Sequence, residues 1–268
     1  MDIATAAAIV KTVSVVVKTA KEFGWIDQLR KLFSETHHVL LLGSSGAGKS
    51  QLLTALEDII PEAISGYART QAREDIAVMI SSKFFNFIDT PGHGGPPGHL
   101  DAEGGATIAR SKAIKDAFGE TLAGVINVVS YGYHETKPPA PTGAFDADHK
   151  VSEDFLNINR DREIKALTEW IGMFQNPHAP TRLITVITKA DLWWSQQEKV
   201  LKHYQSEGYF KALGPVQNIE HVVVEFSSVR QKFYGEGIID GMFDDQERAK
   251  LRAELLRQLL LLSRRSRT

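Results

Sequence analysis

The sequence predicts a three-layer α/β fold, in which a mostly parallel, six-stranded sheet is covered by helices on both faces. Short apolar runs of strand length alternate with helical patterns, which is typical of parallel sheets with helical crossovers. A glycine-rich loop connects the first apolar run to a helix. Two neighbouring runs lie too close together for a crossover, so they predict one antiparallel strand.

Strands are expected where apolar and β-branched residues cluster between turn residues. We place them at residues 38–42, 75–81, 84–89, 123–130, 182–188 and 221–226. Only the short link Ser81-Ser82-Lys83 separates the second run from the third, and this pair is the expected antiparallel hairpin. Helices are expected near residues 49–60, 104–118, 160–175, 195–206 and 244–262.

The composition is that of an ordinary globular chain. Its 268 residues are 43% hydrophobic and 24% charged, which suits one large core and makes a second full domain unexpected. A net charge of −2 gives no field for nucleic-acid binding. The absence of cysteine excludes disulfides and thiolate metal sites, and the first residues do not resemble a secretory signal. We therefore expect a cytoplasmic protein.

The glycine-rich loop has a complete phosphate-binding pattern. Residues 43–50 read Gly-Ser-Ser-Gly-Ala-Gly-Lys-Ser between a strand and a helix, which is the context that this pattern requires. Glycine lets successive N–H groups approach a phosphate, and the helix adds its positive end. Lys49 is expected to reach the β- and γ-phosphates, and the Ser50 hydroxyl to bind Mg²⁺. The expected nucleotide contacts are Gly43, Ser44, Ser45, Gly46, Ala47, Gly48, Lys49, Ser50 and Gln51. A strand-to-helix turn without a ligand is the alternative.

The strand predicted at 84–89 runs into Asp-Thr-Pro-Gly. Asp89 ends this strand at the carboxyl edge, where ligands bind in open α/β sheets, and we expect it to hold the hydration shell of Mg²⁺. Gly92 can offer its N–H to a terminal phosphate. The glycine-rich residues 92–105 are expected to order on the γ-phosphate and to relax after hydrolysis, with a flexible linker as the alternative.

The strand predicted at 182–188 runs into Thr188-Lys189-Ala190-Asp191. The carboxylate of Asp191 can accept from the N1–H and the amino group of guanine, a pair of donors that adenine lacks. The stem of Lys189 is expected to lie along the base. A surface segment that caps the next helix is the alternative. The last strand ends in Ser227 and Ser228, where a backbone N–H can reach the guanine carbonyl, although two serines are also ordinary turn residues.

In this order, the four motifs resemble the G-boxes of P-loop GTPases of the translation-factor-related class, with Era-like, septin-like and immune-associated-like features. The resemblance implies a G domain over about residues 36–262, with GTP or GDP and Mg²⁺ as ligands. His93, directly after Asp-Thr-Pro-Gly, resembles the histidine that orients the attacking water in elongation factors. Thr70 resembles the switch threonine that binds Mg²⁺ in Era-type GTPases, with a loop threonine without a ligand as the alternative.

The resemblance implies a molecular switch that hydrolyses GTP to GDP and phosphate. No arginine finger is assured, so it also implies slow turnover and a protein partner or self-association for activation. The alternative is a GTP-dependent structural or membrane-associated assembly protein with minor hydrolysis. A third reading is an ATP-using P-loop enzyme, in which residues 188–191 match by coincidence.

We divide the chain into an N-terminal helical extension (1–35) and the G domain (36–268) with an insertion at about 131–157. The extension is largely apolar but carries Lys11 and Lys18, and it is too short and too charged to span a bilayer. It can pack on its own domain, lie peripherally on a membrane or pair with another chain. The insertion is rich in proline and polar residues; its aromatic residues are expected either to contact a partner or to be disordered.

Overall fold

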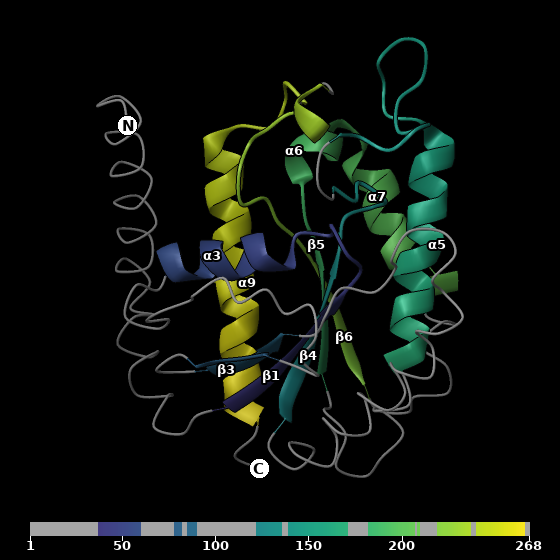
Figure 1. Ribbon diagram of the computed structural model, residues 1–268. Coiled ribbons are helices and arrows are strands. Elements are labelled where there is room, and N and C mark those ends of the chain that lie inside the picture. Colours follow the sequence, from purple (N-terminus) through teal and green to yellow (C-terminus); the bar gives the residue numbers. More distant parts are fainter. Residues whose placement is uncertain are drawn as a thin grey trace.

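The structure is a computed structural model, in which a central sheet lies between two layers of helices (Figure 1). It describes residues 37–59, 78–81, 85–89, 122–135, 139–170, 182–206, 208–209, 219–236 and 240–265. The predicted α/β fold with a parallel sheet is confirmed. The N-terminal extension and the helix predicted at 104–118 lie outside the described residues.

The sheet has the strand order β2-β3-β1-β4-β5-β6. Its strands are β1 (His37–Gly43), β2 (Val78–Ser81), β3 (Phe85–Asp89), β4 (Leu122–Val129), β5 (Arg182–Ile187) and β6 (Glu220–Glu225). Neighbouring strands from β3 to β6 pair in parallel, and β2 pairs antiparallel with β3. The carboxyl ends of the five parallel strands therefore meet at one edge of the sheet, and four of these ends carry the predicted motifs.

Helices α3 and α9 cover one face of the sheet, and α5, α6 and α7 cover the other (Figure 1). The helices are α3 (Lys49–Ile59), α5 (Glu153–Trp170), α6 (Ala190–Trp193), α7 (Gln197–Tyr204) and α9 (Asp245–Arg265), with 3₁₀ turns η2 (Trp194–Gln196) and η3 (Phe233–Gly235). In place of the single helix expected at 195–206, the chain forms α6, η2 and α7 in succession, beginning at Ala190. Among the described residues, no helix is both long and apolar enough to cross a membrane.

Helix α5 begins at Glu153, earlier than the predicted start near residue 160 and inside the predicted insertion. The N–H of Phe155 points to the Ser152 hydroxyl at 3.5 Å, and Glu153 and Asp154 supply negative charge to the first turn. Both features stabilise a helix N-terminus. Capping at Ser152 therefore moves the start of the helix into a stretch that composition alone assigned to a connection.

The core consists of two apolar clusters, one on each face of the sheet. Val39 and Leu41 of β1 belong to the cluster with the leucines of α3 and α9, whereas Leu40 and Leu42 belong to the cluster with α5, α6 and α7. This alternation follows from the pleat of a strand. Strands buried on both faces have nearly continuous apolar sequences, and for that reason the strands were predictable.

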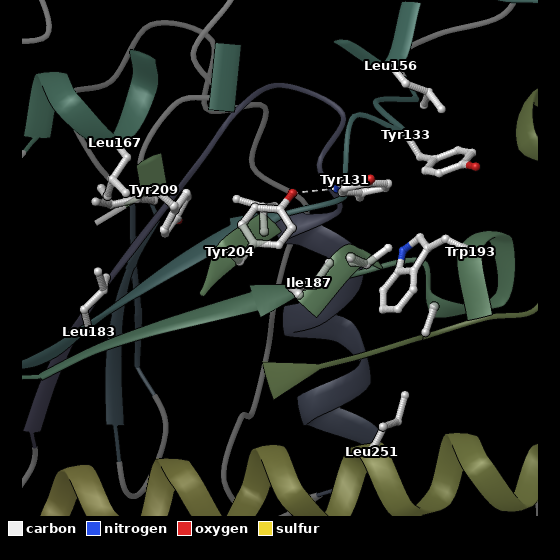
Figure 2. Packing of buried hydrophobic residues seen from close by; sticks show 14 of the residues in the cluster. Tyr131, Tyr133, Leu156, Leu167, Leu183, Ile187, Trp193, Tyr204, Tyr209 and Leu251 are labelled. Carbon is white, nitrogen blue, oxygen red and sulfur yellow. Dashed lines mark hydrogen bonds between the residues drawn. The ribbon is translucent and has the colours of Figure 1, made fainter. Parts of the chain in front are cut away.

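The aromatic residues that follow β4 are part of the second cluster. Tyr131 and Tyr133 are buried, and Figure 2 shows them on the same side of the sheet as Tyr204 and Trp193. The N–H of Tyr131 donates to the Tyr204 hydroxyl at 2.9 Å. The expectation that these aromatic side chains contact a partner or are disordered is therefore wrong, because they complete the core of the domain.

Candidate functional site

The loop after β1 has the tight backbone that its three glycines allow. Gly43, Gly46 and Gly48 have φ values of +145°, +80° and +98°, which disfavour other residues. Neighbouring chain also crowds these positions: a Cβ atom at Gly43 would lie 2.3 Å from the carbonyl oxygen of Val128, and one at Gly46 would lie 2.8 Å from the backbone nitrogen of Glu135. Gly43 and Gly46 are therefore required both by local conformation and by packing against β4 and the segment that follows it.

Polar groups of this loop suit an anionic ligand. The Lys49 amine is buried and donates to the carbonyl of Gly43 at 2.7 Å, so it lies over the loop. The first turn of α3 contains no acidic residue, which leaves its positive end available to an anion. The Ser44 hydroxyl is buried and has no hydrogen-bond partner among the described residues. A buried polar atom of this kind marks a place for a ligand, an ion or water.

The segment after β5 is tied to the phosphate-binding loop by two side chains. The Thr188 hydroxyl donates to the carbonyl of Ala47 at 2.6 Å. The Lys189 amine donates to the carbonyls of Gly46 at 3.1 Å and Tyr133 at 2.6 Å. Burial lowers the pKa of Lys189 to about 8, against the opposing charges of nearby acidic groups. The two predicted motifs thus meet, as the shared sheet edge requires.

Asp191 is the buried carboxylate of the site. Its Oδ1 accepts from the Ser227 hydroxyl at 2.8 Å, and its Oδ2 accepts from the N–H of Gln231 at 3.1 Å. Burial raises the pKa of Asp191, although both hydrogen bonds favour the charged form. The motifs after β5 and β6 are therefore in direct contact, and Asp191 has a fixed orientation.

These residues enclose one small pocket between the ends of β1, β4, β5 and β6. The predicted residues that line it are Gly48, Gln51, Thr188, Lys189, Asp191, Ser227 and Ser228. Glu135 and Gln231 also line it, and neither was predicted from the sequence. The only signal for Glu135 was its place after β4 at the same sheet edge. Gln231 contacts Asp191 through its backbone, which leaves no mark in the sequence.

A second carboxylate, Glu163 of α5, supports the loop that carries Glu135. It is completely buried and accepts from the N–H groups of Ser130 and Gly132 at 2.8 and 3.3 Å, from His134 Nε2 at 2.8 Å and from the Tyr204 hydroxyl at 2.5 Å. Burial alone would raise the pKa of Glu163, but the hydrogen bond and charge of His134 with the other donors hold it below its usual value.

The remaining predicted residues are not tested in the same way. Thr70, Gly92 and His93 lie outside the described residues. Asp89 ends β3 and pairs in register with Leu41 of β1, two residues before the phosphate-binding loop begins. Ser50 is exposed at the start of α3. The Mg²⁺ ligands Ser50, Thr70 and Asp89 therefore stay a prediction.

Comparison with known proteins gives one family match. The sequence pattern of the 50S ribosome-binding GTPase family matches residues 38–170. No protein of curated function matches the sequence.

Two solved structures are similar at low identity. A dimerization-deficient mutant of Toc33 from Arabidopsis thaliana shares 14% identity at a TM-score of 0.47, over 98% of this chain and 94% of that one. A probable GTP-binding protein engB shares 18% identity at a TM-score of 0.44, over 82% of this chain and 99% of that one.

Proposed function

Because the chain carries a P-loop GTPase domain, we propose that it is a guanine-nucleotide switch that binds GTP with Mg²⁺ and hydrolyses it to GDP and phosphate. The observation that carries this proposal is the buried Asp191 carboxylate beside the phosphate-binding loop. Thr188 and Lys189, which precede Asp191 in the chain, hold it there by hydrogen bonds to the loop. One ligand that carries both a base and phosphates can therefore reach both groups.

Guanine is the base that matches Asp191. Its N1–H and amino group are adjacent donors, and a fixed carboxylate accepts both, whereas the N1 of adenine is itself an acceptor and would face a carboxylate oxygen without a hydrogen bond. The contacts from Ser227 and Gln231 hold the carboxylate in place before any ligand arrives. Such preorganisation lowers the cost of binding.

The phosphate end of the nucleotide would be bound by Lys49, by the N–H groups of residues 43–50 and by the N-terminus of α3. In the proposed mechanism, these groups neutralise charge on the transferring phosphoryl group and His93 orients the attacking water. Ser50, Thr70 and Asp89 would hold Mg²⁺, which supplies further charge neutralisation when it is bound.

Calorimetric titration with GDP, ADP and xanthosine diphosphate in the presence of Mg²⁺ tests the proposal. We expect GDP to bind and ADP at the same concentration to give no heat. Asp191→Asn should weaken the binding of GDP and strengthen the binding of xanthosine diphosphate, because the amide group of asparagine can donate to the 2-oxo group of xanthine. Lys49→Ala should weaken the binding of GDP without changing the base preference, since it removes a phosphate contact.

Release of phosphate from GTP, compared between the wild type and Lys49→Ala, completes this test. Equal rates in the two proteins would assign the activity to a contaminant. Equal affinities for GDP and ADP would contradict the guanine assignment and favour a P-loop enzyme that uses ATP.

Activation by a partner or by self-association also stays a prediction, as do membrane contact through residues 1–35 and a cytoplasmic location. The GTP-dependent assembly alternative depends on the same extension, which lies outside the described residues. Light scattering with GDP and with a non-hydrolysable GTP analogue distinguishes the two functions. Because the switch is itself expected to need a partner or self-association, the measurement is made with and without residues 1–34, and a constant mass without liposome binding contradicts the assembly alternative.

A further inference from the structure

The base end of the pocket is closed by residues 227–236, which we call the base-side loop. Two groups of this loop each donate one hydrogen bond to Asp191: the Ser227 hydroxyl donates to Oδ1, and the N–H of Gln231 donates to Oδ2. A carboxylate has about four lone-pair positions, so these contacts leave acceptor capacity for the two donors of guanine. The base-side loop therefore orients Asp191 and does not exclude the base.

Glu135 holds the base-side loop from the opposite wall of the pocket. Its Oε1 accepts from the N–H of Tyr234 at 3.0 Å, and its Oε2 lies 3.4 Å from the side-chain nitrogen of Gln231. One carboxylate thus bonds two residues of the loop, and one of these, Gln231, is also the residue whose N–H reaches Asp191.

The conformation of the base-side loop needs such a restraint. Tyr234 has φ +50°, in the left-handed region that non-glycine residues rarely adopt. A residue in that region is retained only where surrounding contacts fix it. For Tyr234, these contacts include the hydrogen bond from its N–H to Glu135 and the edge-to-face packing of the preceding Phe233 against Tyr133.

Glu135 is itself fixed to the phosphate end of the pocket. Its N–H donates to the carbonyl of Gly46 at 3.1 Å, and its carboxylate lies 3.8 Å from the amine of Lys189. Its side chain is 22% exposed, so water only partly screens these contacts. The residue therefore connects the phosphate-binding loop, the lysine after β5 and the base-side loop.

We propose that Glu135 is a positioning residue for guanine recognition, which holds the base-side loop so that Gln231 and Ser227 fix Asp191 against the base. This inference rests on the proposed function, since it concerns the same pocket. Glu135 acts through Asp191, and its own carboxylate is occupied by the loop.

Stopped-flow dissociation of a fluorescent GDP analogue, with competition by GDP and inosine diphosphate, tests the role of Glu135. Inosine diphosphate lacks the 2-amino group, so it uses only one of the two contacts with Asp191. We expect Glu135→Ala to release the GDP analogue roughly tenfold faster, because hydrogen bonds to a charged group are lost. The preference for GDP over inosine diphosphate should also fall, since the 2-amino group of guanine contributes less to binding when Asp191 is not held in a fixed orientation.

Two further variants control this experiment. Glu236→Ala removes an exposed carboxylate from the same loop and should behave as the wild type. Glu135→Gln keeps an acceptor oxygen for the N–H of Tyr234 and should be intermediate in both readouts. This conservative variant also carries the test if Glu135→Ala does not fold.

Each outcome decides the proposal. Unchanged release and unchanged base preference in Glu135→Ala overturn it while the proposed function stands. Equal weakening of GDP and inosine diphosphate also overturns it, because the role of Glu135 would then be structural only. If the wild type binds no GDP, the proposed function fails first and this inference falls with it.

Discussion

Lys189 is a buried cation on the wall of the pocket. Burial lowers its pKa from 10.5 to about 8, although Glu135, Asp191 and Glu163 pull it upward. A bound nucleotide adds phosphate charge, which favours the protonated amine and raises its pKa. We therefore expect the free protein to lose this proton above about pH 8 and the complex to keep it. We expect affinity for GDP to fall as the pH rises from 8, by at most about tenfold per pH unit.

Calorimetry in two buffers of different ionisation enthalpy measures this linkage directly. Proton uptake on GDP binding should be close to zero at pH 7 and clear at pH 9. Lys189→Arg keeps its charge at both pH values and should take up fewer protons at pH 9 than the wild type, with only the protonation of guanine N1 left. If the wild type took up no protons on GDP binding at pH 9, the assignment of the proton uptake to Lys189 would be contradicted.

Residues of the site differ in how far the sequence can reveal them. Asp191 and Ser227 lie after separate strands, and both were predicted near the base because parallel strands bring their carboxyl ends to one edge, whereas the hydrogen bond between them is a finding of the structure. Glu135 has no such signature, since its partners Gln231 and Tyr234 are distant in the chain and one of them is a backbone group. A single acidic residue after a strand is common, and only the folded structure shows what it contacts.

At the scale of elements, α5 supports the segment after β4 through Glu163. This carboxylate accepts from two N–H groups of the loop after β4, from His134 and from Tyr204 of α7. Glu163→Ala leaves these buried donors without an acceptor and should cost about 3–5 kcal/mol of unfolding free energy. Urea denaturation measures the loss, and Asp161→Ala, at an exposed position of the same helix, is the matched control.

The pH dependence of the same variants distinguishes charge from packing. The pKa of Glu163 is lowered in the folded protein, so the stability due to its charge is fully present above its unfolded value of about 4.5. It is lost as the pH falls through the folded value. Glu163→Gln should therefore be less stable than the wild type at pH 7, and the difference should shrink below pH 4.5. A difference that is the same at both pH values would assign the effect to packing alone.

Elements were predictable where burial dictates the sequence. Runs such as Val39 to Leu42 are apolar throughout because helices cover both faces of the sheet. The chain after β4 was misjudged because the prolines near residue 140 suggested an open connection, whereas Tyr131 and Tyr133 fill the core before them. The start of α5 was missed for a similar reason, since its first turn is polar and only the cap at Ser152 marks it.

At the scale of the whole molecule, the proposed ligand would join elements that are far apart in the sequence. The pocket is formed by residues after β1, β4, β5 and β6, and hydrogen bonds such as those of Thr188 and Ser227 connect these segments. A ligand that binds the folded protein alone stabilises it by about 2.7 kcal/mol at 100 times its Kd. For a chain of this length, that corresponds to a rise in Tm of roughly 5–10 °C. Thermal scanning with Mg²⁺ and GDP should show this rise, ADP should show none, and Asp191→Asn should lose the response to GDP. An equal rise with ADP would mean that the phosphate-binding loop alone carries the affinity, and the role of the buried carboxylate in selecting the base would then be contradicted.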